Sequence, residues 1–273
     1  MTIINTNIQS LVSQQSLVTN GRRLSRSMAE LSTGHRINSA ADDAAGMAIG
    51  SKLRAQVMSL NQAVRNVADG ASLMQTADGA AEGVTQMLFR MRELALQALN
   101  GTNSSSDQTS LNTEYTQLRT QVKDITANTQ WNGMKIIGGD KATVVFQVGA
   151  NATDNVAVLF KNMWVSGVAS GVSGTNLLST GGMNTALSGI DRAMLAVDDF
   201  RSSLGAAINR LSYAADNSVN MMTKTAASRS RIMDTDYAKA TSELARAQII
   251  QQAGTAMLSQ ANQSPRLVAM MLR

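Results

Sequence analysis

The sequence predicts a mostly α-helical protein, a long rod of antiparallel helices in which both termini form a coiled coil and a small β-hairpin region lies in the middle. The 273 residues include a single Pro, the residue least compatible with helix interiors. Apolar residues recur at alternating steps of three and four along several segments, which is the spacing of coiled coils and helix bundles. A period of two, typical of strands, follows Trp131-Asn132-Gly133 in the centre of the chain.

The amino-terminal segment carries the first expected helix. We predict that Leu17, Leu24 and Leu31 contribute to the core of the coiled coil. Further apolar residues that fit this helix are Ile4, Ile8, Leu11 and Met28. Gly34 is expected to end the helix, because Gly adopts the left-handed conformation of a helix C-terminus.

The next helix follows a polar stretch. Asn38 or Ser39 is the expected N-cap, and Asp42 and Asp43 fall in the first turn, where negative charge complements the helix dipole. Its apolar ladder is the most regular in the chain and consists of Leu53, Val57, Leu60, Val64, Val67, Ala71 and Met74.

A loop is expected over residues 100–107, which are rich in Asn, Gly and Ser. Ser106 or Asp107 is the expected cap of the helix that follows. That helix repeats the spacing of three and four at Leu111, Tyr115, Leu118, Val122 and Ile125.

The centre of the chain is predicted to be a hairpin followed by a loop. Residues 142–148 and 156–160 read as two strands around a polar turn, within a β-hairpin region at about 140–160. Residues 162–183 are rich in Gly and Ser and are expected to form a short variable surface loop.

Helices resume at about Asn184 and continue almost to the end. The two remaining ladders are Leu204, Ile208, Leu211, Ala215, Ser218, Met222 and Thr225, and then Ala240, Leu244, Ala247, Gln251, Gly254, Leu258 and Ala261. Leu244 and Leu258 are the predicted coiled-coil core residues of the last helix. Its small and polar rungs predict weak burial within one chain, so we expect the terminal segments to order when neighbouring subunits complete the core.

The two helical halves predict two domains. Residues 1–45 and 229–273 are expected to form a discontinuous coiled-coil domain, and residues 46–228 a helical-bundle domain that contains the hairpin and the loop. Such a chain pairs its termini with each other and displays its middle.

The composition excludes most enzyme classes. The chain has no Cys and one His, His35, so thiolate nucleophiles, Cys-ligated metals and two-His metal sites are ruled out. Adjacent carboxylates occur at Asp42-Asp43 and Asp198-Asp199, but neighbours in a helix point to different sides. We predict no catalytic, cofactor-binding or metal-binding residues, no cofactor and no enzymatic activity.

The net charge of +5 raises the question of a nucleic-acid partner. The basic residues are scattered, the densest early cluster is Arg22, Arg23 and Arg26, and two Trp, three Tyr and four Phe form no stacking platform. We therefore predict no nucleic-acid partner. No apolar run approaches the length of a membrane span, so no membrane insertion is expected. The start lacks the features of a secretory signal peptide, which alone favours a cytoplasmic location.

Both ends of the chain resemble bacterial flagellin, and the resemblance covers roughly residues 1–155 and 184–273. The matching stretches are Ile3–Ile8, Leu31–Ile49, Arg90–Gln97, Trp131–Gly133, Phe146–Asn151, Ile232–Ala238 and Ala253–Asn262. The chain departs from the family pattern at His35, at Phe89 and in the Met-rich tail Arg266–Arg273. Its centre is short, so it is similar to a form of flagellin with a minimal central region.

The resemblance implies a structural subunit that self-assembles into the helical flagellar filament used for motility. In that family the paired termini form an inner coiled coil, adjoining helices form a second layer, and the centre faces solvent. The implied partners are further copies of the chain, hook-junction and cap proteins, an export chaperone and the flagellar type III export apparatus. Export through that apparatus implies a secreted, extracellular protein without a signal peptide, which overturns the cytoplasmic inference.

The resemblance also implies a host partner, the Toll-like receptor that senses flagellin. The matching positions for that contact are Arg90, Leu94 and Glu114. Phe89 replaces a residue that is usually polar in the family and is expected to weaken the contact.

Two alternatives remain open at this point. The hook–filament junction protein of the same superfamily shares both termini but is present in few copies. A flagellin whose centre carries an enzymatic or ligand-binding activity belongs to a different class, and the centre offers no His for it.

Overall fold

A computed structural model gives the structure of residues 6–139, 142–160 and 162–271. The described residues are mostly α-helical, as predicted. They fall into two compact units. Unit 1 comprises residues 1–57 and 223–273, and unit 2 comprises residues 58–222.

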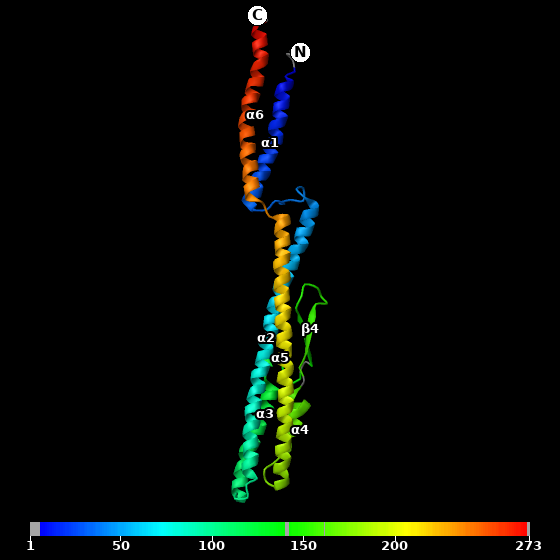
Figure 1. Cartoon of the computed structure of the whole chain (residues 1–273), viewed down its shortest axis with the longest axis vertical. Helices are drawn as coiled ribbons and strands as arrows, with labels where there is room; N and C mark the ends of the chain where they lie inside the picture. Colours follow the sequence, from blue (N-terminus) through cyan, green and yellow to red (C-terminus); the bar gives the residue numbers. More distant parts are fainter. Residues whose placement is uncertain (1–5, 140–141, 161, 272–273) are drawn as a thin grey trace. The chain divides into compact units, whose positions relative to one another are not determined.

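Unit 1 contains two antiparallel helices, α1 (Ile8–Thr33) and α6 (Tyr237–Met271), which lie side by side in Figure 1. Helix α1 ends at Gly34, whose φ of 71° lies in the left-handed region, as the sequence predicted. The backbone N–H of Thr235 donates to the carbonyl of Gly34 at 2.9 Å, so the segments that flank the two helices are hydrogen-bonded to each other.

Unit 2 is a helical bundle formed by α3 (Ser105–Asn128) and by the parts of α2 (Ala44–Ala98) and α5 (Thr180–Met233) that fall within residues 58–222. Helices α2 and α5 run antiparallel beside each other (Figure 1), and two of the ion pairs that join them are Arg92–Asp191 and Arg201–Asp78. Most of their predicted ladder residues are buried or half-buried in this unit. The largest fully buried side chains are Leu60, Met74, Leu88, Met91, Leu94, Tyr115, Ile137, Phe160, Leu177, Ile190, Leu204 and Leu211.

The start of α2 differs from the prediction. Asn38 and Ser39 do not cap the helix, because their backbone N–H groups donate to the carboxylate of Asp42 at 3.2 and 3.0 Å. Asp43 acts as the cap, since its carboxylate accepts a backbone N–H of the first turn, from Gly46, at 2.8 Å. The polar stretch therefore folds into a local turn before the helix begins.

The cap of α3 also differs from the prediction. Ser104 is the N-cap, not Ser106 or Asp107. Asp107 completes a capping box, in which its carboxylate accepts the backbone N–H of Ser104 at 2.9 Å while the Ser104 hydroxyl accepts the backbone N–H of Asp107 at 3.2 Å. The sequence-based choice missed the reciprocal pair and started the helix too late.

The predicted hairpin is confirmed. Strands β3 (Thr143–Gln147) and β4 (Asn155–Leu159) pair antiparallel, with Val145 opposite Ala157. Phe146 and Val158 face the core of unit 2.

A second, smaller hairpin was not predicted. Strands β1 (Gln130–Trp131) and β2 (Met134–Lys135) pair around Asn132 and Gly133, whose φ values of 48° and 77° are those of a type I′ turn. The Asn-Gly dipeptide carries this signal in the sequence.

The prediction of a surface loop over residues 162–183 is wrong. A short π-helix, η1 (Trp164–Val168), and α4 (Ala169–Val172) occupy it, and α5 begins at Thr180. Its apolar residues Met163, Val168, Val172, Leu177 and Met183 are buried. The glycines that suggested a loop serve close packing instead, because a Cβ on Gly171 would overlap the carbonyl of Gly189 in α5.

Candidate subunit interface

The seam between α1 and α6 follows alternating steps of three and four residues on both helices, as in a coiled coil. Residues at these steps are buried or half-buried, whereas most of those between them are exposed. On α1 they are Ser10, Ser13, Leu17, Asn20, Leu24, Ser27 and Leu31. On α6 they are Ala240, Leu244, Ala247, Gln251, Gly254, Leu258 and Ala261.

All five leucines that the sequence placed in the coil lie on this seam. Leu17, Leu24, Leu31, Leu244 and Leu258 are each half-buried rather than fully buried. Their part in polymerisation stays a prediction, whereas their place between the two helices is a property of the structure.

Three residues assigned to the same helix do not lie on the seam. Ile8, Leu11 and Met28 are more than half exposed. The reason is that the buried or half-buried positions beside them are Ser10, Ser13 and Ser27. Ile4 lies outside the described residues.

Small residues on α6 let the two helices approach closely. Ala240, Ala247, Gly254 and Ala261 recur every seven residues along the seam. A Cβ on Gly254 would lie 2.6 Å from a methyl group of Leu17, so the leucine fills the space that the glycine leaves. The seam therefore has few large apolar layers.

Asparagine side chains reach across the seam to the backbone of α6. The Nδ2 of Asn20, which is 5% exposed, donates to the carbonyl oxygen of Ala247 at 2.7 Å and to Oε1 of Gln251 at 3.1 Å. Asn7 makes the same kind of bond to the carbonyl of Ala261 at 2.7 Å. A buried polar residue in a coiled coil fixes the register of its helices. Reading the heptads through Ser and Asn, and not only through apolar residues, would have found these positions.

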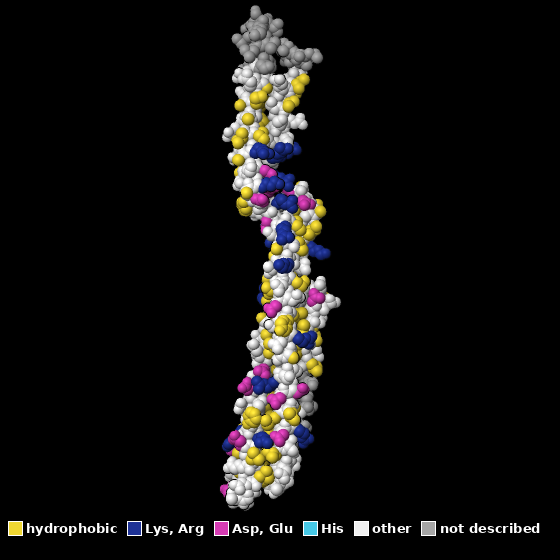
Figure 2. Space-filling view, in the orientation of Figure 1, with side chains coloured by type: hydrophobic (Ala, Val, Ile, Leu, Met, Phe, Trp, Pro, Cys, Tyr) yellow, Lys and Arg dark blue, Asp and Glu magenta, His cyan; other side chains and the backbone are white. Residues whose placement is uncertain are grey.

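Outside the seam, both helices carry exposed large apolar side chains. Seven of them are Ile8, Leu11, Val12, Val18, Ile249, Ile250 and Met257, with exposed fractions from 41 to 65%. We call them the outer apolar residues, and Figure 2 shows hydrophobic side chains along this helix pair. A helix that pairs with one partner and otherwise faces water normally carries polar residues at such positions. Apolar residues on both sides indicate that further surfaces cover the pair.

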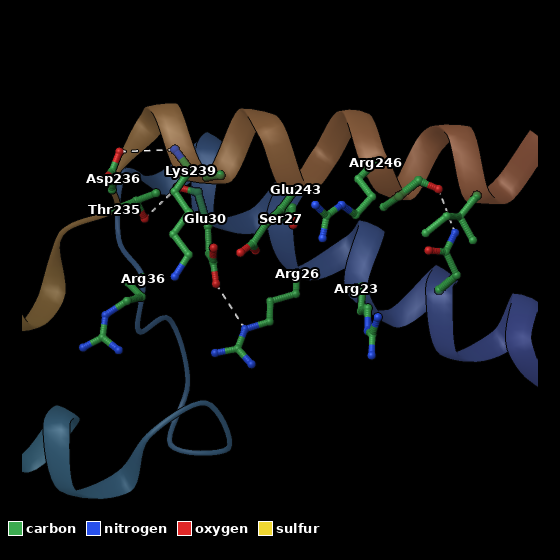
Figure 3. Close-up of a pocket in the computed structure, with 14 residues that line it drawn as sticks. Arg23, Arg26, Ser27, Glu30, Arg36, Thr235, Asp236, Lys239, Glu243 and Arg246 are labelled. Carbon is green, nitrogen blue, oxygen red and sulfur yellow. Dashed lines mark hydrogen bonds and ion pairs between the residues drawn. The ribbon is translucent and has the colours of Figure 1, made fainter.

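A groove of about 510 Å³ lies between α1 and α6 within unit 1 (Figure 3). Its lining includes the cations Arg23, Arg26, Arg36, Lys239 and Arg246 and the carboxylates Glu30, Asp236 and Glu243. The sequence did not predict it, because its charges come from two segments that are 200 or more residues apart.

Unit 2 holds the residues predicted for the host-receptor contact. The Arg90 guanidinium lies 2.9 Å from a carboxylate oxygen of Glu114 and 3.1 Å from one of Glu93. Hydrogen bonds to these carboxylates, that to Glu114 first, raise the pKa of Arg90 above its ordinary value. Leu94 is 0% exposed and belongs to the core of unit 2, so the expectation that it offers a contact surface is corrected.

The described residues offer no site for metal chemistry. Within them, no group of three or more His, Asp or Glu side chains could hold a metal ion. Over the same part of the chain, none of the helices is both long enough and apolar enough to cross a membrane.

Comparisons with known proteins match both ends of the chain. Residues 4–142 match the family model of the bacterial flagellin N-terminal helical region, and residues 187–272 match that of the flagellin C-terminal helical region. A flagellin of Halalkalibacterium halodurans is 40% identical over 271 residues, which cover 99% of this chain and 100% of that protein.

Solved structures agree. The crystal structure of Bacillus cereus flagellin aligns with a TM-score of 0.52 and 30% identity, over 56% of this chain and 88% of that one. A putative flagellar hook-associated protein from Vibrio parahaemolyticus aligns with a TM-score of 0.59 over 71% of this chain and 100% of that one. Its identity of 15% shows a shared fold alone. With both terminal regions matched and a relative aligned over its whole length, the chain belongs to the bacterial flagellin family.

Proposed function

We propose that the outer apolar residues of α1 and α6 are the surface through which this chain polymerises. A flagellin is a structural subunit that self-assembles into the helical flagellar filament used for motility. One observation supports this assignment. The helices α1 and α6 already pack against each other, and they still expose large apolar side chains. Covering this surface with neighbouring copies removes it from water and favours assembly.

On this proposal the terminal segments 1–45 and 229–273 form the inner coil of the filament, and residues 46–228 form the layer around it. The distribution of buried side chains supports these different roles for the terminal and central residues. The largest fully buried side chains of the described residues all lie between Leu60 and Leu211, so the central residues have a core of their own. The terminal helices have none of these and need neighbours to bury their apolar surface.

The test compares two adjacent exposed positions on α6. Ile249 is 65% exposed, and Ile249→Glu places a charge where the proposal expects a subunit contact. Gln248→Glu is the matched control at an exposed polar position next to it. Electron microscopy under polymerising conditions should show filaments for the control and none for Ile249→Glu. Normal filaments from Ile249→Glu would refute the assignment of this surface.

The family supports further partners. We infer that the chain leaves the cell through the flagellar type III export apparatus with an export chaperone and meets hook-junction and cap proteins at the filament ends. It is then a secreted, extracellular structural protein without enzymatic activity. The hook–filament junction role is the alternative, and copy number on purified flagella separates the two, since a filament subunit is present in great excess.

The host Toll-like receptor that senses flagellin is a further proposed partner, now with Arg90 and Glu114 as the exposed candidates. The two side chains form an ion pair about half exposed on each side, which a partner can reach. Arg90→Ala should weaken binding of the monomer to the receptor at least tenfold if Arg90 is an anchor of the contact. Arg210→Ala, at another exposed position of unit 2, is the control. Equal affinity of both variants and the unmodified chain would remove this partner contact.

A further inference from the structure

The groove between α1 and α6 contains more cations than the chain itself neutralises. Arg26 is paired with Glu30 at 3.1 Å, and Arg36 donates to the carbonyl of Ile232 at 2.6 Å. Arg23, Lys239 and Arg246 have no carboxylate partner within the residues that the structure describes. We call these three the groove cations.

The carboxylates of the groove do not balance them. Glu30 is occupied by Arg26, and the carboxylate of Asp236 accepts the backbone N–H groups of Ala238 and Lys239 at the start of α6. This leaves Glu243 as the one lining carboxylate with neither an ion pair nor a hydrogen bond among the described residues.

Four of the cations that line the groove point in one direction. Figure 3 shows the head groups of Arg23, Arg26, Arg36 and Lys239 pointing to the same side of the helix pair, while Arg246 extends from α6 toward α1. Figure 2 shows Lys and Arg side chains gathered over the same part of unit 1. The groove cations therefore form one surface and not three isolated charges.

The charged residues of the whole chain are also distributed unevenly, with the excess of cations in unit 1. Residues 1–57 and 223–273 contain 13 Lys or Arg and 6 Asp or Glu, whereas residues 58–222 contain 11 Lys or Arg and 13 Asp or Glu. Copies of a basic terminal unit repel one another when they are brought together unless negative groups lie between them. The mildly acidic central unit of another copy offers such groups.

We propose that the groove cations are a docking surface for exposed carboxylates of a second copy of this chain. This inference rests on the proposed filament function and adds an ionic contact to the apolar one. The chain supplies suitable carboxylates, since Asp69, Asp124 and Asp216 of the described central unit are exposed and have no ion pair. Three carboxylates inside the groove itself disfavour a long polyanion such as nucleic acid, which needs an uninterrupted basic track.

The first test measures the critical concentration for polymerisation at two ionic strengths. The groove variant combines Arg23→Gln, Lys239→Gln and Arg246→Gln. At low salt its critical concentration should rise on the order of tenfold over the unmodified chain, because three attractive contacts are lost. Near 0.5 M salt the difference should shrink to about twofold or less, since exposed ion pairs are screened there.

A control variant removes the same charge from the same unit outside the groove, at the exposed residues Arg22, Lys52 and Lys224. It should leave the critical concentration unchanged or lower it by relieving repulsion. If the groove variant also polymerises more readily at low salt, or behaves as the control does, repulsion dominates and the docking surface is refuted. Far-UV circular dichroism of both variants checks that unit 2 remains folded.

The second test identifies the contact itself. Filaments grown from a mixture of ¹⁴N- and ¹⁵N-labelled chains are treated with a carbodiimide, which joins the Lys239 amine to a carboxylate in direct contact. Mass spectrometry should find Lys239 joined to an Asp or Glu of the opposite label. Products confined to one label, such as Lys239 joined to its own Glu243, would overturn the inference. If the unmodified chain forms no filament at all, the proposed function fails first and this inference with it.

Discussion

Asn20 offers the sharpest test of how the terminal helices pair. Asn20→Ala removes two hydrogen bonds from a nearly buried position, those to the carbonyl of Ala247 and to Gln251. Each such bond contributes about 1 kcal/mol net, so the loss is about 1–2 kcal/mol for each α1–α6 pair. The substitution leaves no buried acceptor without a hydrogen bond. The Ala247 carbonyl still accepts a bond within its own helix, and Gln251 reaches solvent. If the pair must form for a subunit to join, the critical concentration should rise about five- to thirtyfold.

The assay is sedimentation of filaments at a series of total protein concentrations, which gives the critical concentration directly. Gln14→Ala is the matched control, since Gln14 is an exposed amide on α1 outside the seam. It should change the value by less than twofold. A change of less than twofold for Asn20→Ala as well would refute the reasoning, because it would mean that the buried hydrogen bonds do not help to hold the pair in the filament.

Three further predictions address the terminal segments and the start of α3. Deleting residues 240–273 should abolish polymerisation and leave residues 58–222 folded, as checked by electron microscopy and circular dichroism. Normal filaments from the truncated chain would show that the pairing of α1 with α6 is not needed for polymerisation. In dilute monomer the terminal helices should be largely disordered, so helix content measured by circular dichroism should rise on assembly; equal helicity in both states would count against this. Hydrogen bonds from Ser104 hold the pKa of Asp107 below its ordinary value. The stabilisation that they provide is present above the unfolded-state pKa of about 3.9 and is lost as the pH falls through the lower folded-state pKa. Hydrogen exchange should therefore show the first turn of α3 fraying more in acid in the unmodified chain than in Asp107→Asn, whose side chain does not titrate.

The sequence was sufficient for the helices that have large apolar ladders and for the hairpin. The ladder from Leu53 to Met74 and the alternation of residues 142–148 each have one period over several repeats, so local pattern and tertiary packing agree. Residues 162–183 were misread because glycine is ambiguous. In a loop it supplies freedom, whereas Gly171 supplies room for another backbone, and only the position of Gly189 on α5 distinguishes the two.

The candidate interface was only partly predictable for a related reason. Leu17 and Leu258 were found because leucine at coiled-coil spacing is a strong signal. Asn20 was passed over because a search for apolar rungs rejects asparagine. The groove cations come from α1 and α6, and no local pattern states that Arg23 and Arg246 line the same groove.

The misassigned residues Ile8, Leu11 and Met28 show why a polymerising chain defeats the usual reading of a core. In a monomeric protein, apolar residues that repeat along a helix are buried by the same chain. In this chain the seam uses small and polar side chains, while larger apolar ones such as Val12 and Ile249 remain exposed on the outer faces. A weak seam with an apolar exterior is unfavourable for a dilute subunit. Neighbours that bind only the ordered state stabilise it, and this stabilisation grows with their concentration. On the proposed function, the same arrangement couples folding of the termini to assembly, and we expect the terminal helices to gain their stability where and when a filament forms.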